Sequence, residues 1–415
     1  MQLRLILSAL FACWAGLSAD WPQWRGPERN SLSAERISTN WPAAGPRVLW
    51  RAAIGTGFSS ISISQGRAYA LGNSNNTDTV WCFDALTGKL LWKHTYPSRL
   101  DPQWYEGGPG ATPTVASNCV FTLSKWGDVF CLDAVKGTVL WSRDLRQDHF
   151  KPNRWGFAGS PLLWRNLVIL NAGDAGVALD RLNGRIVWSA GTNAAGYASP
   201  TFFPDPHFAP LAPRPSVLIF AARHLVALDP ASGRELWRHP WQTDWDTNIP
   251  DPLVWGETIF ISSFSRGCAL LTIRGGRPEA LYDTKALCNH LSPALLLGDY
   301  LYGFNGEAKT DTDFRCLHLP TGRVLWTRKD PPFGSLIGVD GRLLILSGKG
   351  ELLLLQPSTL NAQLSANSPC SADRGPYLAR AKVLGGTCWT PPALANGLLY
   401  VRNAKGDLRC LDLRP

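Results

Sequence analysis

The chain has 415 residues, and 41 Lys and Arg against 32 Asp and Glu give a formal net charge of +9. The basic residues are scattered without a Lys/Arg run, so we interpret the charge as a solvated surface and exclude a nucleic-acid-binding stripe. Nineteen Trp and few helix-period segments favour an all-β protein, and a chain of this length buries an ample core without disulfides.

Residues 1–19 predict a secretory signal peptide, because Arg4 precedes an apolar run over residues 5–17 that ends in small residues. The run is shorter than the ~20 residues of a membrane span, and no later stretch reaches that length. We therefore expect an exported protein, periplasmic or secreted, without a transmembrane span. As an alternative, residues 10–13 faintly resemble a lipoprotein cleavage box, which would anchor the protein to the envelope through Cys13.

Residues 20–47 form a predicted N-terminal arm rich in Pro and Trp. It opens with Trp-Pro-Gln-Trp-Arg-Gly-Pro at 21–27, and its Pro and Gly density argues against regular structure. The Trp residues suggest that the arm is pinned to the outside of the domain that follows, residues 48–415.

That domain repeats one pattern, clearest at residues 82–92 as Cys-Phe-Asp-Ala-Leu-Thr-Gly-Lys-Leu-Leu-Trp. The Gly lies four residues after the Asp, and the Trp lies four after the Gly. The recurring positions are Asp84, Asp133, Asp180, Asp229 (His318 in a fifth copy), Gly88, Gly137, Gly184, Gly233, Gly322, Trp92, Trp141, Trp188, Trp237 and Trp326. Weaker copies run from Leu270 to Tyr282 and from Leu354 to Leu364, and a last copy is cut off after Cys410.

Each copy predicts two strands joined by a tight turn. The Asp side chain can accept hydrogen bonds from backbone amides two residues on, and Gly accepts the positive φ of such a turn. The Trp can lie against the next repeat, where its burial is worth at most about 5 kcal/mol. A pattern that recurs in every good copy indicates a packing device rather than a set of active sites.

The repeat period, in the 40s, predicts four strands per unit and a closed β-propeller. Trp50 ends the last strand of a repeat, but no Asp-Gly turn and no strand of the same repeat precede it in the chain. Residues 408–412 form the strand before such a turn, but no last strand follows them. We expect these two to complete one blade, which gives eight blades and no free sheet edge. Eight second strands support the count, at residues 68–71, 120–123, 168–170, 217–220, 259–262, 300–302, 343–346 and 398–401.

Nine cysteines follow Cys13. Four share one repeat position, and equivalent positions in different blades are too far apart to bridge, so we expect buried thiols; these are Cys82, Cys131, Cys316 and Cys410. Cys370 and Cys388 could pair with each other or with Cys288. No Cys or His spacing suggests a metal site.

Ligand contacts are expected on the connections that follow each Trp, because the Asp-Gly turns all face the other side of the ring. These connections are the individual parts of the sequence, and their aromatic, basic and acidic residues would converge on the mouth of the central channel. The alternative is that they only cap the channel. The candidates are Trp104, Tyr105, Glu106, Arg154, Trp155, Asp244, Trp245, Asn289, His290, Arg380 and Trp389.

The repeat resembles that of the pyrroloquinoline quinone (PQQ) propeller superfamily, on the Ala-Leu-Asp…Gly…Trp motif. The superfamily contains quinoprotein alcohol dehydrogenases and non-enzymatic members, among them the propeller lipoprotein of the bacterial outer-membrane β-barrel assembly machine. Residues 21–27, 108–113 and 196–200 are similar to exported bacterial PQQ-like proteins.

The resemblance to the dehydrogenases implies a quinone stacked between a Trp and a vicinal disulfide, with Ca²⁺ beside a catalytic Asp. The sequence has no Cys-Cys pair, and Glu106, Asp244 and Asp246 match no such local pattern. We therefore predict a monomeric, non-catalytic module that binds a protein or an envelope polymer at the channel mouth, with no catalytic, cofactor or metal residue assigned. The alternative is a dehydrogenase using PQQ and Ca²⁺, or another small-molecule enzyme, with its site at the same mouth.

Overall fold

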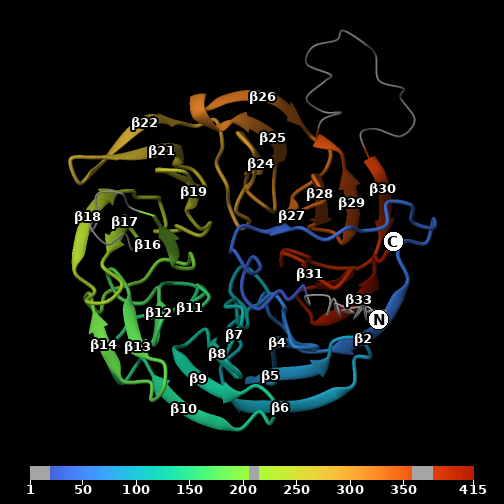
Figure 1. The fold of residues 1–415 in the computed structure, drawn as a ribbon, viewed down its shortest axis with the longest axis horizontal. Coiled ribbons are helices and arrows are strands. Elements are labelled where there is room, and N and C mark those ends of the chain that lie inside the picture. The colour runs from blue at the N-terminus through green and yellow to red at the C-terminus, as the bar shows by residue number, and fades with distance from the viewer. Residues whose placement is uncertain (1–18, 205–214, 358–376) are drawn as a thin grey trace, which may run out of the picture.

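The repeats fold into the blades of an eight-bladed β-propeller (Figure 1) in a computed structural model, which describes residues 19–204, 215–357 and 377–415. Each blade is a four-stranded antiparallel sheet whose strands pair in the order A, B, C, D, from the axis to the circumference. The predicted fold class and blade count are confirmed.

Blades 1–4 follow the chain without a crossover. Their strands are β3 (Ser62–Ser64), β4 (Arg67–Ser74), β5 (Thr77–Asp84) and β6 (Leu90–Pro97); β7 (Thr114–Ala116), β8 (Cys119–Leu123), β9 (Asp128–Asp133) and β10 (Val139–Asp144); β11 (Leu162–Trp164), β12 (Leu167–Leu170), β13 (Val177–Asp180) and β14 (Ile186–Ser189); β15 (Thr201–Phe203), β16 (Ser216–Phe220), β17 (His224–Leu228) and β18 (Glu235–Pro240).

Blades 5–8 continue the ring, and the last one takes its outer strand from the N-terminal part of the chain. Their strands are β19 (Leu253–Trp255), β20 (Thr258–Ser263), β21 (Gly267–Arg274) and β22 (Arg277–Thr284); β23 (Leu295–Leu297), β24 (Tyr300–Gly306), β25 (Thr312–His318) and β26 (Arg323–Arg328), with the 3₁₀ helix η1 (Leu319–Thr321); β27 (Gly334–Val339), β28 (Arg342–Ser347), β29 (Glu351–Leu355) and β30 (Tyr377–Lys382); β31 (Ala393–Ala395), β32 (Leu398–Arg402), β33 (Asp407–Asp412) and β2 (Val48–Ala53).

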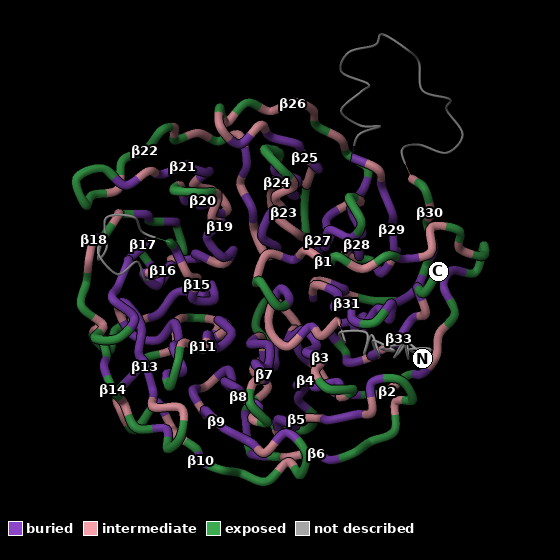
Figure 2. Tube along the Cα trace, in the orientation of Figure 1, coloured by how far each residue is buried: buried purple, intermediate pink, exposed green. Residues whose placement is uncertain are grey.

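Burial follows the position of a strand in its blade. B and C strands are covered by neighbouring blades on both faces and are apolar runs, such as buried β12. Outer strands such as β10 alternate, and only residues like Trp141 turn inward. Exposed residues therefore gather on the outer strands and the turns (Figure 2).

The repeat residues join each blade to the next, as predicted. The indole N–H of Trp92 donates to the carbonyl of Ala134 at 3.0 Å, and Trp50, Trp141 and Trp188 make the same bond one blade apart. A Cβ added to Gly137 would lie 2.5 Å from the Trp92 ring, so the glycine is required for this close approach. Tyr282 replaces Trp in blade 5, with its hydroxyl donating to Leu319.

The turn chemistry also follows the prediction. Asp84 accepts from the backbone and hydroxyl of Thr87, and Asp133 and Asp180 accept from the amides two and three residues on. The glycine of each turn has a positive φ, near 70° at Gly88.

The predicted closure of the ring is confirmed. β2 pairs with β33 in antiparallel register, with Trp50 opposite Cys410, as Trp92 lies opposite Cys82 in blade 1. Arg47 binds Asp412 across the seam at 2.9 Å.

Blade 7 differs from the expected repeat. Its outer strand is β30, which pairs with β29, whereas we predicted a strand ending at Leu364. That residue lies outside the described residues. β30 carries Ala379 opposite Leu354, at the position that Trp occupies elsewhere, so the sequence lacks the mark that identified the other outer strands.

The prediction that the arm lies outside the ring is wrong. Trp21 bridges Ile63 in blade 1, the amide of Val115 donates to Pro22, and β1 (Leu32–Ser33) pairs in parallel with β27. The arm thus contacts the innermost strands of blades 1, 2 and 7 and crosses the centre of the ring (Figure 1). The inner strands leave unpaired backbone N–H and C=O groups toward the axis, and the arm forms hydrogen bonds with several of them.

The ring has two different faces. Because strands alternate in direction, the A–B and C–D turns of every blade lie on one face, called here the turn face. In blade 1, for example, the amide of Ala85 in the C–D turn donates to the carbonyl of Gly66 in the A–B turn. The B–C turns and the connections between blades lie on the opposite face, called the pocket face.

The cysteines of the repeat are buried free thiols, as expected. Cys288 and Cys388 are also free, so they do not pair with each other, and Cys370 lies outside the described residues. Within the described part of the chain, no helix is long and apolar enough to cross a membrane.

Candidate functional site

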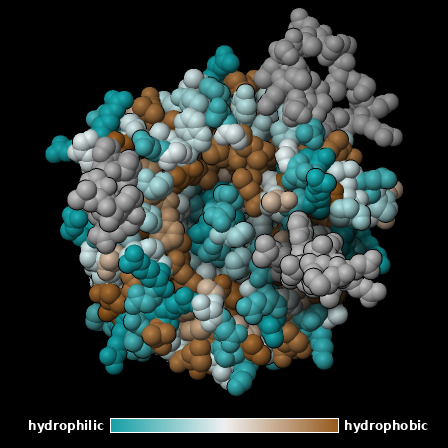
Figure 3. Space-filling view, in the orientation of Figure 1, coloured by the Kyte–Doolittle hydropathy of each residue, from teal (hydrophilic) through white to brown (hydrophobic). Residues whose placement is uncertain are grey.

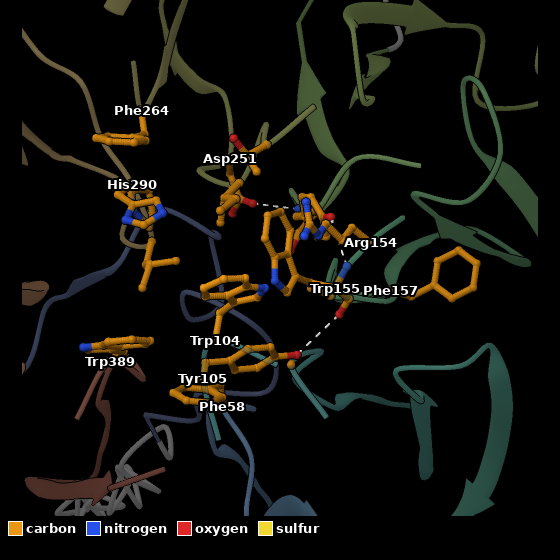
Figure 4. Close-up of a pocket in the computed structure, with 18 of the residues that line it drawn as sticks. Phe58, Trp104, Tyr105, Arg154, Trp155, Phe157, Asp251, Phe264, His290 and Trp389 are labelled. Atoms are coloured by element: carbon orange, nitrogen blue, oxygen red, sulfur yellow. Dashed lines mark hydrogen bonds between the residues drawn. The ribbon is translucent and has the colours of Figure 1, made fainter. Parts of the chain in front are cut away.

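A cavity of about 550 Å³ lies at the channel mouth on the pocket face (Figure 4). The connections that lead into blades 1–6 and into blade 8 contribute to its walls, together with the B–C turns of blades 5 and 6. Trp24 of the arm also lines it. The arm crosses the channel from the turn face, so the cavity is a cup that opens on the pocket face.

The walls of the cup are aromatic. Trp389 stacks on Phe58 with centroids 5.6 Å apart and an interplanar angle of 27°, and Phe58 contacts Tyr105 at 5.5 Å. On the other side, Trp155 lies 5.9 Å from Tyr197. Flat apolar faces at this density favour a ligand that carries a ring or an apolar side chain.

Two aromatic side chains stand at the rim. Trp104 is 74% exposed and Trp245 is 60% exposed, so neither contributes much to the core. Trp104 has a φ of 67°, an uncommon conformation for a residue other than Gly. Backbone strain of this kind persists only where neighbouring contacts over-determine it.

Cations lie against these rings. The guanidinium carbon of Arg154 is 5.4 Å from the Trp155 centroid and 5.2 Å from that of Trp245. The ammonium of Lys309 lies 5.4 Å from the Trp389 centroid and donates to the Trp104 carbonyl. Because cations already cover these faces, the cup has less capacity for a cationic ligand than a bare aromatic cage.

Lys125 holds the connection that carries Trp104 and Tyr105. Its side chain is 2% exposed, and Nζ donates to the Asp101 carbonyl at 3.1 Å and to its carboxylate at 3.0 Å. The same ammonium lies 5.0 Å from the Tyr105 ring. Burial lowers the pKa of Lys125, while Asp101 opposes the shift.

The floor of the cup is a buried charged cluster. The Trp24 indole N–H donates to Asp251 Oδ2 at 2.6 Å, and the Ser199 amide donates to Oδ1 at 2.7 Å. Arg25 Nη1 lies 3.8 Å from the same carboxylate, with both side chains at most 5% exposed. Arg29 donates to the carbonyls of Pro161 and Pro200, each just before an inner strand, and burial lowers its pKa to about 10.

His290 is neutral at physiological pH. Burial lowers its pKa to about 4, with Glu307 opposing and Lys309 adding to the shift. Its Nδ1 accepts from the Ala308 amide at 3.2 Å, which leaves the proton on Nε2. The ring lies 4.9 Å from Phe264 and forms part of the wall.

Most of the predicted candidates meet at this cup. Those that line it are Trp104, Tyr105, Arg154, Trp155, Trp245, His290 and Trp389. Glu106 instead accepts from Thr387 at 2.6 Å and ties two connections together. Asn289 is buried and donates to the Phe304 carbonyl, and Asp244 is exposed outside the cup.

The placement of Arg380 at the mouth is wrong. It lies in β30 on the circumference, where it binds Glu351 and Asp330. The error follows from blade 7, whose outer strand we had assigned to an earlier segment.

Several lining residues escaped the sequence analysis, namely Trp24, Phe58, Tyr197, Phe264, Glu307 and Lys309. Phe58 and Tyr197 stand shortly before inner strands and were not among the residues predicted to contact a ligand. Trp24 was missed because nothing in its local sequence indicates that the arm enters the channel.

The lining residues do not fit the calcium that the resemblance implies. The carboxylates in the cup are Asp251 and Glu307. Asp251 is held by Trp24, Ser199 and Arg25, so a cation would compete with a buried guanidinium. Among the described residues, no group of three His, Cys, Asp or Glu could hold a metal.

The fold and the cup define a class: an eight-bladed propeller of PQQ-like repeats with an aromatic pocket at one mouth of its channel. A family model described as outer membrane protein assembly factor BamB matches residues 76–328, more than half of the chain, and the chain belongs to this family. No curated protein matches the sequence.

Solved structures show the same fold. BamB from Moraxella catarrhalis has a TM-score of 0.63 at 16% identity, over 88% of this chain and 99% of that one. A europium-containing methanol dehydrogenase has a TM-score of 0.65 at 13% identity, over 94% and 89%. The quinohemoprotein alcohol dehydrogenase from Comamonas testosteroni has 0.66 at 13%, over 96% and 81%. BamB and dehydrogenases therefore share this architecture, and at these identities the likeness concerns the fold alone.

Proposed function

We propose that the protein is an exported, non-catalytic propeller that binds a protein or a cell-envelope ligand in the aromatic cup. The observation that carries the proposal is the rim: Trp104 and Trp245 are largely exposed, and the guanidinium of Arg154 lies against the Trp245 ring. Exposed aromatic and Arg side chains around an apolar pocket are typical of binding hot spots. Family membership and the likeness to BamB support a binding role.

The test is capture from a cell-envelope extract by the immobilised protein. We expect Trp104→Ala with Trp245→Ala to reduce the specifically retained material at least tenfold, because each side chain loses its contact area. The matched control is Leu281→Ala with Leu378→Ala, which removes two exposed apolar side chains from outer strands. Retention equal to bare resin, or equal retention by the rim variant and the control, would contradict the proposal.

The alternative, a dehydrogenase using PQQ and Ca²⁺, has a direct test. The protein is mixed with both and followed for a quinone absorbance shift and for alcohol-dependent dye reduction. We expect neither, because the carboxylates of the cup are committed or too few to hold the metal. Turnover with any alcohol would replace the binding proposal with an enzymatic one.

A further inference from the structure

The exposed apolar side chains of the ring are concentrated in one sector. Of the thirteen exposed large hydrophobic side chains described, eight lie in blades 1–3: Leu86, Leu90, Leu91, Val135, Val139, Leu140, Leu182 and Val187. All belong to C–D turns or to the starts of outer strands. Figure 3 shows hydrophobic side chains along the lower rim, over β6, β10 and β14.

Three of these residues occupy the same repeat position. Leu86, Val135 and Leu182 each stand two residues after the turn Asp, and they are 53%, 46% and 82% exposed. Equivalent residues of adjacent blades lie at one height along the propeller axis, so the three tips share a plane parallel to the ring. Such an array fits a flat surface better than a partner that inserts into a groove.

The turns hold these tips rigidly. Asp133 accepts from the amide of Val135, and Asp180 accepts from the amide of Leu182, each at 2.8–2.9 Å. The carboxylates therefore face the turn backbone that they bind. The apolar side chains project from ordered turns, so little conformational entropy is lost on docking.

Cations accompany the tips. Lys89, Lys136 and Arg185 are exposed, and no carboxylate lies within ion-pair distance of them among the described residues. The A–B and C–D turns of blades 1–3 carry six cations against three carboxylates: Arg67, Lys89, Lys136, Arg165, Arg181 and Arg185 against Asp84, Asp133 and Asp180. This sector is positively charged.

Blades 5 and 6 provide an internal comparison. Their equivalent turns carry three cations, Arg274, Arg277 and Arg323, against two carboxylates, Glu257 and Asp299. The exposed large hydrophobic described there is Tyr300, at 37%, and no aliphatic tip is exposed in their C–D turns. Exposed aliphatic tips together with three excess cations are thus a property of one sector rather than of the repeat.

We propose that the turn face of blades 1–3 docks on an anionic lipid membrane surface. Leu86, Val135 and Leu182 enter the interface, and the neighbouring cations pair with lipid headgroups, the two contributions that bind peripheral proteins to such membranes. In this orientation the aromatic cup, on the opposite face, points away from the lipid and stays open. Ala19, where the described chain begins, also lies at the turn face, with its amide donating to Asn396.

The test is flotation with vesicles of phosphatidylcholine, with and without phosphatidylglycerol. Every protein carries Cys13→Ser, so that no acyl chain at that position contributes. We expect binding to the anionic vesicles that decreases as salt is raised. Lys89→Gln with Lys136→Gln and Arg185→Gln should weaken it on the order of a hundredfold, and Leu86→Ser with Val135→Ser and Leu182→Ser should weaken it at least tenfold.

The matched control is Arg274→Gln with Arg277→Gln and Arg323→Gln, which removes the same charge from blades 5 and 6 and should keep the binding. Thermal unfolding verifies that all variants are folded, as expected for exposed positions. Failure of the parent protein to bind anionic vesicles, or an equal loss in the control, would overturn the proposal. Concentration-dependent self-association abolished by the apolar variant would also overturn it, in favour of a second copy of this chain. Capture at the cup is measured without lipid, so its outcome is independent of this one.

Discussion

Removal of the Asp251 carboxylate is expected to release the N-terminal arm from the channel. Asp251→Ala leaves the Arg25 guanidinium, 3% exposed, without its carboxylate, and it also leaves the Trp24 indole N–H and the Ser199 amide without their acceptor. The arm can escape these losses by leaving the hub, since it is held by few backbone bonds, whereas the blades are held by complete sheets.

The magnitude is set mainly by the buried charge. Removing one partner of a buried ion pair costs about 3–5 kcal/mol, and each unpaired donor adds about 1–3 kcal/mol if it stays buried. Arg25 retains bonds to Ser31 and to the Asn30 carbonyl, and the unpaired donors regain water once the arm opens, so the buried charge alone sets the expected loss. We expect arm opening to become favoured by about 3–5 kcal/mol, which is roughly 10²- to 10⁴-fold.

Hydrogen exchange measures this opening directly. The amides of Ile63, Val115 and Gly338 donate to arm carbonyls, so their exchange should accelerate by that factor in Asp251→Ala, while peptides from the C strands keep their protection. Arg25→Met with Asp251→Leu, which replaces the pair by apolar side chains, should lose much less protection than Asp251→Ala alone.

Asp244→Ala is the control, because this carboxylate lies in the same connection but is exposed. Unchanged exchange at Val115 in Asp251→Ala would refute the reasoning, since it would mean that the arm does not depend on the charged cluster. Equal acceleration in Asp244→Ala would refute it as well.

Two further predictions concern stability. Gly137→Ala should destabilise the fold by about 2–4 kcal/mol in denaturant unfolding, because the added Cβ meets the Trp92 ring at 2.5 Å and φ is positive. The control is Gly66→Ala, where φ is the same but the space around the added Cβ is open, and it should cost only about 1 kcal/mol. Equal losses of stability in the two variants would contradict the packing argument. Burial raises the pKa of Asp78 to about 6 from an ordinary 3.8, so the folded state binds the extra proton between these values and the ionised carboxylate opposes folding above pH 6. Asp78→Asn should therefore raise the unfolding free energy by up to about 3 kcal/mol at pH 7.5 and by little at pH 4, and a gain independent of pH would contradict this assignment.

Much of the fold could be predicted because the repeat is local. An Asp that binds amides two residues on, a Gly that adopts positive φ and a Trp four residues later act within one hairpin, so the pattern marks each blade. Closure of the ring by Trp50 and Cys410 was predictable for the same reason, as two halves of one unit. Blade 7 was misplaced where the pattern fails, since Ala379 stands where a Trp would have marked the strand.

The candidate site was predictable only in outline. Connections that follow each outer strand must reach the channel mouth, which placed Trp104, Arg154 and Trp245 correctly. Lys125 could not be identified as the support of the rim, because nothing in its local sequence indicates that its side chain is buried against Asp101, 24 residues earlier in the chain.

The sequence by itself determined the blade, its number of copies and the seam, because these depend on contacts within a hairpin or between identical units. Only the tertiary structure decided that the arm enters the channel, where Trp24 and Arg25 meet Asp251. That contact joins residues more than two hundred positions apart, and its stability depends on burial and on unpaired inner-strand amides, neither of which the local pattern contains.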